Sequence, residues 1–276
     1  FTTAPLLSIC CRAGRASRFV RMSATVKRIR SVFLDFDDTL CLTTVHDTSA
    51  YRAAMEVLAS ESSRTDIRAD ATISHYKAAL KCAPWDPDGK EDVYEWRSKL
   101  WAAALEAQQA EACEALVLGK RMQQAFDKCR LGELRLVEGA TELCEQLHAE
   151  GRHVVIITNG HARVQRDKLH AVNMASIVPE SHILVGGEHA NEKPHASIFR
   201  KALEIVGCEA HEAVHVGDSW TSDVVGANNT SLAAAVWVNR SGMPKPSPHV
   251  SIPCFNVQSV CDLKDVLHSL EHDTMH

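Results

Sequence analysis

The stretch FLDFDDTL, residues 33–40, places three carboxylates directly after an apolar segment. Asp35, Asp37 and Asp38 repel one another, so they cost stability unless a positive group lies among them. Polar residues follow other apolar segments as well, and these are the remaining candidates for chemistry: Thr158, Asn159 and Gly160 after one segment, Lys193 after another, and Asp218, Ser219 and Asp223 at a third.

These polar residues lie within a pattern of strands that alternate with helices. Short apolar stretches predict strands at 31–36, 153–158, 182–185, 213–218 and 233–239. Helical periodicity predicts helices over 139–151 and 193–207, the second with Pro at its start and Gly at its end. The alternation predicts an α/β fold with a doubly wound, Rossmann-like parallel sheet. In such sheets ligands bind at the carboxyl ends of the strands, where the candidate residues lie.

A long helical segment interrupts this pattern. Residues 44–134 are rich in Ala, Glu, Gln and Lys and show helical periodicity. A single long crossover is the alternative, but about ninety residues is too long for one. The sequence therefore predicts a helical cap at 44–134, inserted into a core made of 29–43 and 135–276.

The first 28 residues differ from the rest. They carry Arg and Lys but no Asp or Glu, which is typical of an organelle transit peptide. The alternative is a mispredicted start, because the chain does not begin with Met and Met22 precedes a plausible beginning. In either case residues 1–28 are expected to lie outside the fold. We expect a cytoplasmic protein, or an organellar one if the segment is a transit peptide.

Composition excludes several classes of partner. The chain of 276 residues has a net charge of -5 and a pI of about 6.3, so no general field attracts nucleic acid or an anionic membrane. No apolar run approaches the roughly 18 residues of a membrane span. No zinc-ligand spacing is present among the cysteines and histidines. We expect a soluble protein whose partner is a small molecule, and the sequence leaves the oligomeric state open, although a monomer fits.

The convergence of several carboxylates without arginine indicates a hard divalent cation, and oxygen ligation suits Mg²⁺. Mg²⁺ takes only one or two carboxylates, so others remain for chemistry. Lysine, threonine and backbone amides beside the metal can neutralise the oxygens of a phosphoryl group. One carboxylate can attack phosphorus, and another can protonate the leaving alcohol. The sequence predicts a Mg²⁺-dependent phosphomonoesterase.

The motifs DFDDT, TNG, KP and GDSWTSD resemble, in order and spacing, those of the haloacid dehalogenase-like superfamily of phosphohydrolases. The match runs from about residue 31 to 270. The segments ITNGHARVQRDKL, LVGGEHANEKPHASIF, HVGDSWTSDVVGA and VWVNRSG are similar to the N-acylneuraminate-9-phosphatase family.

The resemblance implies a role for each candidate. Asp35 is the expected nucleophile and Asp37 the general acid and base. Mg²⁺ is expected on Asp35, the backbone carbonyl of Asp37, and Asp218. The remaining roles are phosphate binding by Thr158, Asn159, Gly160 and Lys193, and support of the site by Thr39, Ser219 and Asp223. Thr39 either orients an aspartate or shapes the turn, and Asp38 is expected to take no part.

The implied substrate is a sugar phosphate such as N-acylneuraminate 9-phosphate. The alternatives are a phosphatase for a nucleotide or another sugar phosphate, a haloacid dehalogenase, and a non-catalytic binding protein. Asp37 counts against a dehalogenase, because a halide leaving group needs no acid. For an acidic substrate, Arg163 and Arg166 are better placed than the cap residues Arg52 and Lys77.

Overall fold

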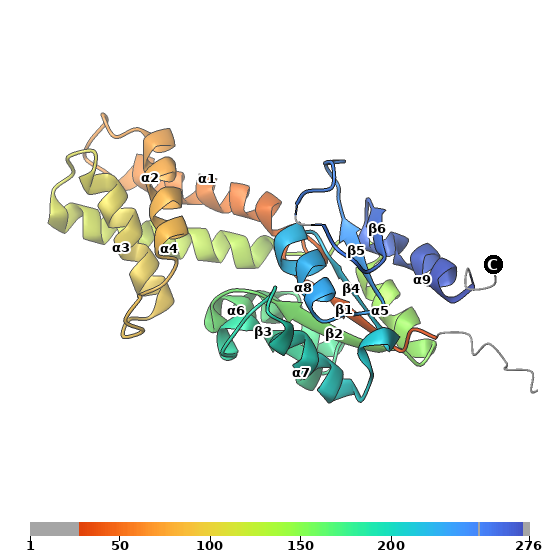
Figure 1. Ribbon diagram of the computed structural model, residues 1–276. Coiled ribbons are helices and arrows are strands. Elements are labelled where there is room, and N and C mark those ends of the chain that lie inside the picture. Colours follow the sequence, from red (N-terminus) through yellow and green to blue (C-terminus); the bar gives the residue numbers. More distant parts are fainter. Residues whose placement is uncertain (1–27, 248, 273–276) are drawn as a thin grey trace, which may run out of the picture.

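A six-stranded sheet forms the centre of the protein (Figure 1). The computed structural model describes residues 28–247 and 249–272, so the predicted leader, Arg28 excepted, lies outside the described residues. All neighbouring strands are parallel, in the order β3-β2-β1-β4-β5-β6. The strands are β1 (Ser31–Leu34), β2 (His153–Thr158), β3 (Ile183–Val185), β4 (Ala213–Gly217), β5 (Ala234–Val238) and β6 (Cys254–Val257). The chain order changes direction between β1 and β4, which is where such sheets bind ligands.

All five predicted strands are confirmed, and their observed ends lie within a residue or two of the predicted ones. The sequence does not predict β6. This strand lies at the edge of the sheet, and of its four residues only Val257 is buried while Asn256 is exposed. A half-exposed edge strand lacks the continuous apolar run that marks a strand covered on both faces.

Helices cover both faces of the sheet, as a doubly wound fold requires. Val32 and Leu34 of β1 pack into one apolar cluster and Phe33 into the other, because side chains alternate along a strand. The first cluster includes residues of α5 (Ala140–Ala149), α6 (Ala162–Ala171) and α9 (Leu263–His272), and the second those of α7 (Ala196–Val206) and α8 (Val225–Asn229). The predicted fold class is confirmed.

Between β1 and β2 the chain forms a lobe of four helices beside the sheet (Figure 1). They are α1 (Thr43–Glu61), α2 (Ala69–Cys82), α3 (Val93–Glu106) and α4 (Ala112–Glu133). The lobe has its own apolar core, in which Trp101 stacks on Tyr76 with ring centroids 3.7 Å apart. None of the helices in the described part of the chain is long and apolar enough to cross a membrane. These bounds support the proposed division into a cap of 44–134 and a core of 29–43 and 135–276.

The close packing of α3 against α4 depends on Gly119. A Cβ at this position would lie 2.5 Å from the Ser98 carbonyl oxygen and 2.8 Å from the Ala102 nitrogen, both backbone atoms of α3. Gly132 lies on the same helix with nothing within 4 Å of its Cβ position. The two glycines therefore allow a controlled comparison: an added Cβ meets backbone at Gly119 and open space at Gly132.

We expect Gly119→Ala to lower the free energy of unfolding by about 1–3 kcal/mol, because α3 and α4 must move apart. We expect Gly132→Ala to raise it by about 0.5–1 kcal/mol through helix propensity alone. Urea unfolding of both variants measures the difference. Equal effects of the two substitutions would contradict the packing described for α3 and α4.

Candidate active site

The carboxyl ends of β1, β2 and β4 meet around one cavity. Asp35 follows β1, Thr158 ends β2, and Asp218 follows β4. The cavity has a volume of about 220 Å³, and its lining includes every predicted site residue except Thr39 and Gly160. Its lining residues are Asp35, Asp37, Asp38, Thr158, Asn159, Lys193, Asp218, Ser219, Ser222 and Asp223. Neighbouring parallel strands end at the same edge, which is why residues far apart in sequence converge here.

Lys193 is the positive group among the acids. Its Nζ lies 2.5 Å from Asp35 Oδ1 and 2.7 Å from Asp223 Oδ1, and the residue is only 4% exposed. Asn159 fixes the lysine backbone, donating to its carbonyl oxygen at 2.7 Å and accepting from its N–H at 2.9 Å. A buried ammonium group paired with two carboxylates is well compensated, and removing either partner would leave a buried charge.

Asp223 is fully used in holding this arrangement. Its Oδ1 also lies 2.8 Å from His215 Nε2, and its Oδ2 accepts from the Ser219 N–H at 3.0 Å. Burial alone would raise the pKa of Asp223, but Lys193 and His215 outweigh it and hold the pKa at about 2. A Cβ at Gly217 would lie 2.2 Å from Asp223 Cγ, so this close approach requires glycine. Asp223 therefore positions Lys193.

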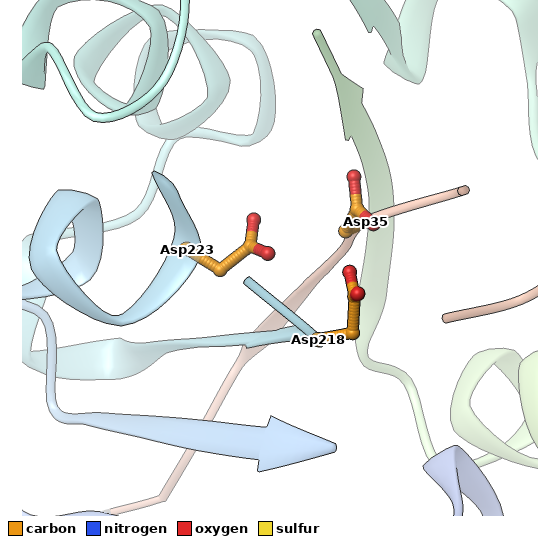
Figure 2. A group of neighbouring side chains, drawn as sticks. All are labelled: Asp35, Asp218 and Asp223. Atoms are coloured by element: carbon orange, nitrogen blue, oxygen red, sulfur yellow. The ribbon is translucent and has the colours of Figure 1, made fainter. Parts of the chain in front are cut away.

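A divalent cation fits the remaining acidic groups. Asp35, Asp218 and Asp223 each offer a carboxylate oxygen within 4.8 Å of the others, and Figure 2 shows the three side chains converging. Burial raises the pKa of Asp35 to about 8, with Lys193 opposing and Asp223 adding to the effect. Burial and Asp223 likewise raise the pKa of Asp218 to about 6. Among the described residues no side chain donates a hydrogen bond to the Asp218 carboxylate. All-oxygen ligands suit Mg²⁺. Within the described part of the chain Asp218 is not ion-paired, and Asp35 uses only its Oδ1 in the Lys193 ion pair, so both are freer to bind a cation than Asp223.

Asp37 is held by two residues of α6 that the sequence reasoning missed. Lys168 Nζ lies 2.8 and 2.9 Å from its two oxygens, and Gln165 Nε2 lies 2.8 Å from Oδ2. Burial would raise the pKa of Asp37, but Lys168 and Gln165 outweigh it and lower the pKa. Gln165 also donates to the Thr158 hydroxyl. Gln165 and Lys168 are three residues apart on a helix that begins just after TNG, so they share one face, and this spacing could have identified them.

Gly160, Thr39 and Asp38 bind neither Lys193 nor the acids of the cavity in this structure. The Gly160 N–H donates to Glu192 Oε2 at 3.0 Å, so in this structure it is engaged by a carboxylate. The Thr39 hydroxyl is buried without a hydrogen-bond partner, so it orients no aspartate here. Asp38 accepts from the Thr44 N–H at 3.0 Å and from the Thr44 hydroxyl, at the start of α1. Its carboxylate therefore caps the N-terminus of α1, the first helix of the helical lobe.

The haloacid dehalogenase-like hydrolase family model matches residues 29–229 of this chain. Two curated proteins illustrate the relatives. The N-acylneuraminate-9-phosphatase of Homo sapiens is 28% identical over 253 residues, which cover 89% of this chain and 96% of the relative. The glyceraldehyde 3-phosphate phosphatase of Pyrococcus furiosus is 26% identical over 212 residues, covering 77% and 81% of the two chains.

Solved structures share the fold. A 2-haloacid dehalogenase from Pseudomonas syringae pv. Tomato superposes with a TM-score of 0.63 at 24% identity, covering 87% of this chain and 98% of the other. The HAD-hydrolase YfnB from Bacillus subtilis, bound to magnesium, superposes with a TM-score of 0.62 at 23% identity, covering 87% of this chain and 99% of the other. The family match runs from β1 to α8 and so includes four of the six strands, the helical insert and the converging acids described above. The chain belongs to the haloacid dehalogenase-like hydrolases.

Proposed function

We propose that this protein hydrolyses a sugar phosphate, N-acylneuraminate 9-phosphate, with Mg²⁺ and through a phosphorylated Asp35. As a haloacid dehalogenase-like phosphatase it is a phosphoric monoester hydrolase. The observation that carries the proposal is the Lys193 ion pair with Asp35, set 2.5 Å away in a cavity that also holds the unneutralised Asp218. A nucleophile, a phosphate-binding cation and a metal ligand thus face one small volume.

In the first step an Asp35 oxygen attacks phosphorus. The new P–O bond to Asp35 forms while the ester P–O bond breaks and the leaving alcohol takes a proton. Lys193 and Thr158 neutralise the phosphoryl oxygens, which gain charge in the transition state. Asp35, the backbone carbonyl of Asp37 and Asp218 would hold Mg²⁺, which would supply further positive charge beside the phosphoryl group. Asp223 acts through Lys193 by fixing its position.

In the second step water attacks the phosphoryl group, breaking its bond to Asp35 and releasing inorganic phosphate. Asp37 is the proposed donor of the proton in the first step and acceptor in the second. The bonds from Lys168 and Gln165 hold Asp37 ionised, which is the form needed to accept a proton from water. To protonate the leaving alcohol, Asp37 must first give up these bonds and take up a proton from solvent as substrate enters. The proton it later accepts from the attacking water replaces the one it donated.

The substrate assignment is supported by the similar curated relatives. The three N-acylneuraminate-9-phosphatases match over 89% of this chain, a length that takes in most of the helical cap as well as the core. Glyceraldehyde 3-phosphate and ribulose-1,5-bisphosphate phosphatases also match, so the coarser class is small phosphorylated metabolites. The likeness to dehalogenases is one of fold, and Asp37 has no task in releasing a halide.

Phosphate release with Mg²⁺ or EDTA tests the proposal. The panel contains N-acetylneuraminate 9-phosphate, hexose phosphates, nucleoside monophosphates and 2-chloropropionate. We expect Mg²⁺-dependent release, fastest from the nine-carbon acid, and a loss of at least about a thousandfold in Asp35→Asn, because an amide does not attack phosphorus.

Asp265→Asn, an exposed acid on α9, is the matched control and should keep full activity. Phosphate release confined to another compound of the panel would contradict the proposed substrate. Chloride release from 2-chloropropionate would contradict the proposed phosphatase reaction.

Asp218→Asn tests the metal site. The pKa of Asp218, about 6 when folded, exceeds its ordinary value of 3.8, so the folded state binds more protons above pH 4 and the metal-free protein loses stability as pH rises. We expect the metal-free variant to melt above wild type at pH 7.5, with the difference vanishing below pH 4. Added Mg²⁺ should raise the melting temperature of wild type only. An equal response of both proteins to Mg²⁺ would place the metal elsewhere.

A further inference from the structure

A buried arginine of the cap has no carboxylate partner among the described residues. Arg97, on α3, is 8% exposed, and its Nε donates to the Pro84 carbonyl at 3.3 Å. No carboxylate in the described part of the chain comes within 4.0 Å of its guanidinium nitrogens. An uncompensated buried cation is strongly unfavourable, so its presence indicates that something else supplies the anion.

The other buried arginines are compensated within the chain. Arg130, on α4, pairs with Asp47 at 3.5 Å and with Asp127 at 3.6 Å. Arg152 lies 2.7 Å from Glu271. Arg130 therefore has two ion-pair partners, whereas Arg97 has none among the described residues. The acid whose charge acts on Arg97 is the more distant Asp127, which Arg130 already shares.

Arg97 lies where the cap meets the catalytic loop. Tyr94, one helical turn earlier on the same face of α3, donates to Asp167 of α6 at 2.6 Å. Trp85, next to the carbonyl that Arg97 contacts, packs against His161 with ring centroids 5.7 Å apart. His161 directly follows Gly160 of the predicted phosphate loop, and burial together with the charge of Arg97 lowers the pKa of its imidazole.

The arginines and lysine considered from the sequence are engaged or exposed. Arg166 pairs with Glu180 at 2.5 Å and Glu188 at 2.6 Å, and Arg163 pairs with Asp92. Arg52 and Lys77 are exposed on the cap. None of these four is a buried cation that lacks an anion.

We propose that Arg97 binds a carboxylate of the substrate, at the end of the molecule remote from the phosphate. This rests on the proposed function, since N-acylneuraminate 9-phosphate carries its carboxylate at the opposite end of the carbon chain from the phosphoryl group. A planar guanidinium binds a carboxylate through two parallel hydrogen bonds, which gives both charge balance and orientation. Arg97 thereby selects phosphates that carry a carboxylate and rejects their neutral analogues.

The test compares two substrates that differ only in this charge, N-acetylneuraminate 9-phosphate and its methyl ester. We expect wild type to prefer the acid by roughly 10- to 100-fold in kcat/KM, the range for a hydrogen-bonded charge pair. Arg97→Met should lose that preference. The melting temperature of Arg97→Met should not fall below that of wild type, because the substitution removes a buried cation without an ion pair. If Arg97 served only the fold, its loss would lower the melting temperature.

Lys99→Met is the matched control, an exposed cation two residues along α3 that pairs with Glu91, and it should keep the preference. An unchanged preference in Arg97→Met would overturn the proposal. If that variant does not fold, Arg97→Lys replaces it: this variant keeps the charge without the fork, and a preference equal to wild type would equally overturn the role of Arg97.

A second pair separates this inference from the substrate assignment. Wild type could turn over 6-phosphogluconate but not glucitol 6-phosphate, and Arg97→Met could lose that turnover. This result would support carboxylate binding by Arg97 even if the nine-carbon acid is not cleaved. Cleavage of the nine-carbon acid and its ester at equal rates by wild type would overturn the role of Arg97 and leave the proposed function standing.

Discussion

The site depends on one buried ammonium group shared by two carboxylates. Lys193 joins Asp35, at the end of β1, to Asp223, beyond the end of β4, and so fixes two neighbouring strand tips relative to each other. The surrounding contacts serve this pair. Asn159 holds the lysine backbone, and His215 and Ser219 hold Asp223. Because each partner is buried, loss of either charge would leave the other uncompensated, which makes the geometry rigid.

Charges without partners are as informative as the pair itself. Asp218 receives no hydrogen bond from a described side chain, and Arg97 has no carboxylate in the described residues within ion-pair distance. Stable folds seldom leave buried charge unbalanced except where a ligand balances it. In our account Mg²⁺ compensates the first, and a carboxylate on the substrate the second. The two groups have opposite sign and lie in different lobes, so the proposed substrate, a phosphate with a remote carboxylate, would contact both lobes.

Much of the core could be predicted from the sequence because local pattern and fold agree there. The apolar runs before Asp35 and Asp218 mark strands, and their parallel order brings the acids together. β6 was missed because an exposed edge strand carries no such run. Lys168 and Gln165 were missed although their spacing marks one helix face, and His215 although it is a polar residue inside an apolar strand. Arg97 is different: its lack of an ion pair within the described residues follows from how α3 packs against α2 and α4, and no local pattern reports that.

The most direct test of the account is to trap the enzyme during turnover. Acid quenching in the presence of substrate and Mg²⁺, followed by digestion and mass spectrometry, should find one phosphoryl group on the peptide containing Asp35, at its carboxylate. The adduct should disappear when substrate is exhausted. Steady turnover with a phosphoryl group on another residue, or with none on any peptide at quenching times shorter than one turnover, would contradict the role of Asp35 as the nucleophile.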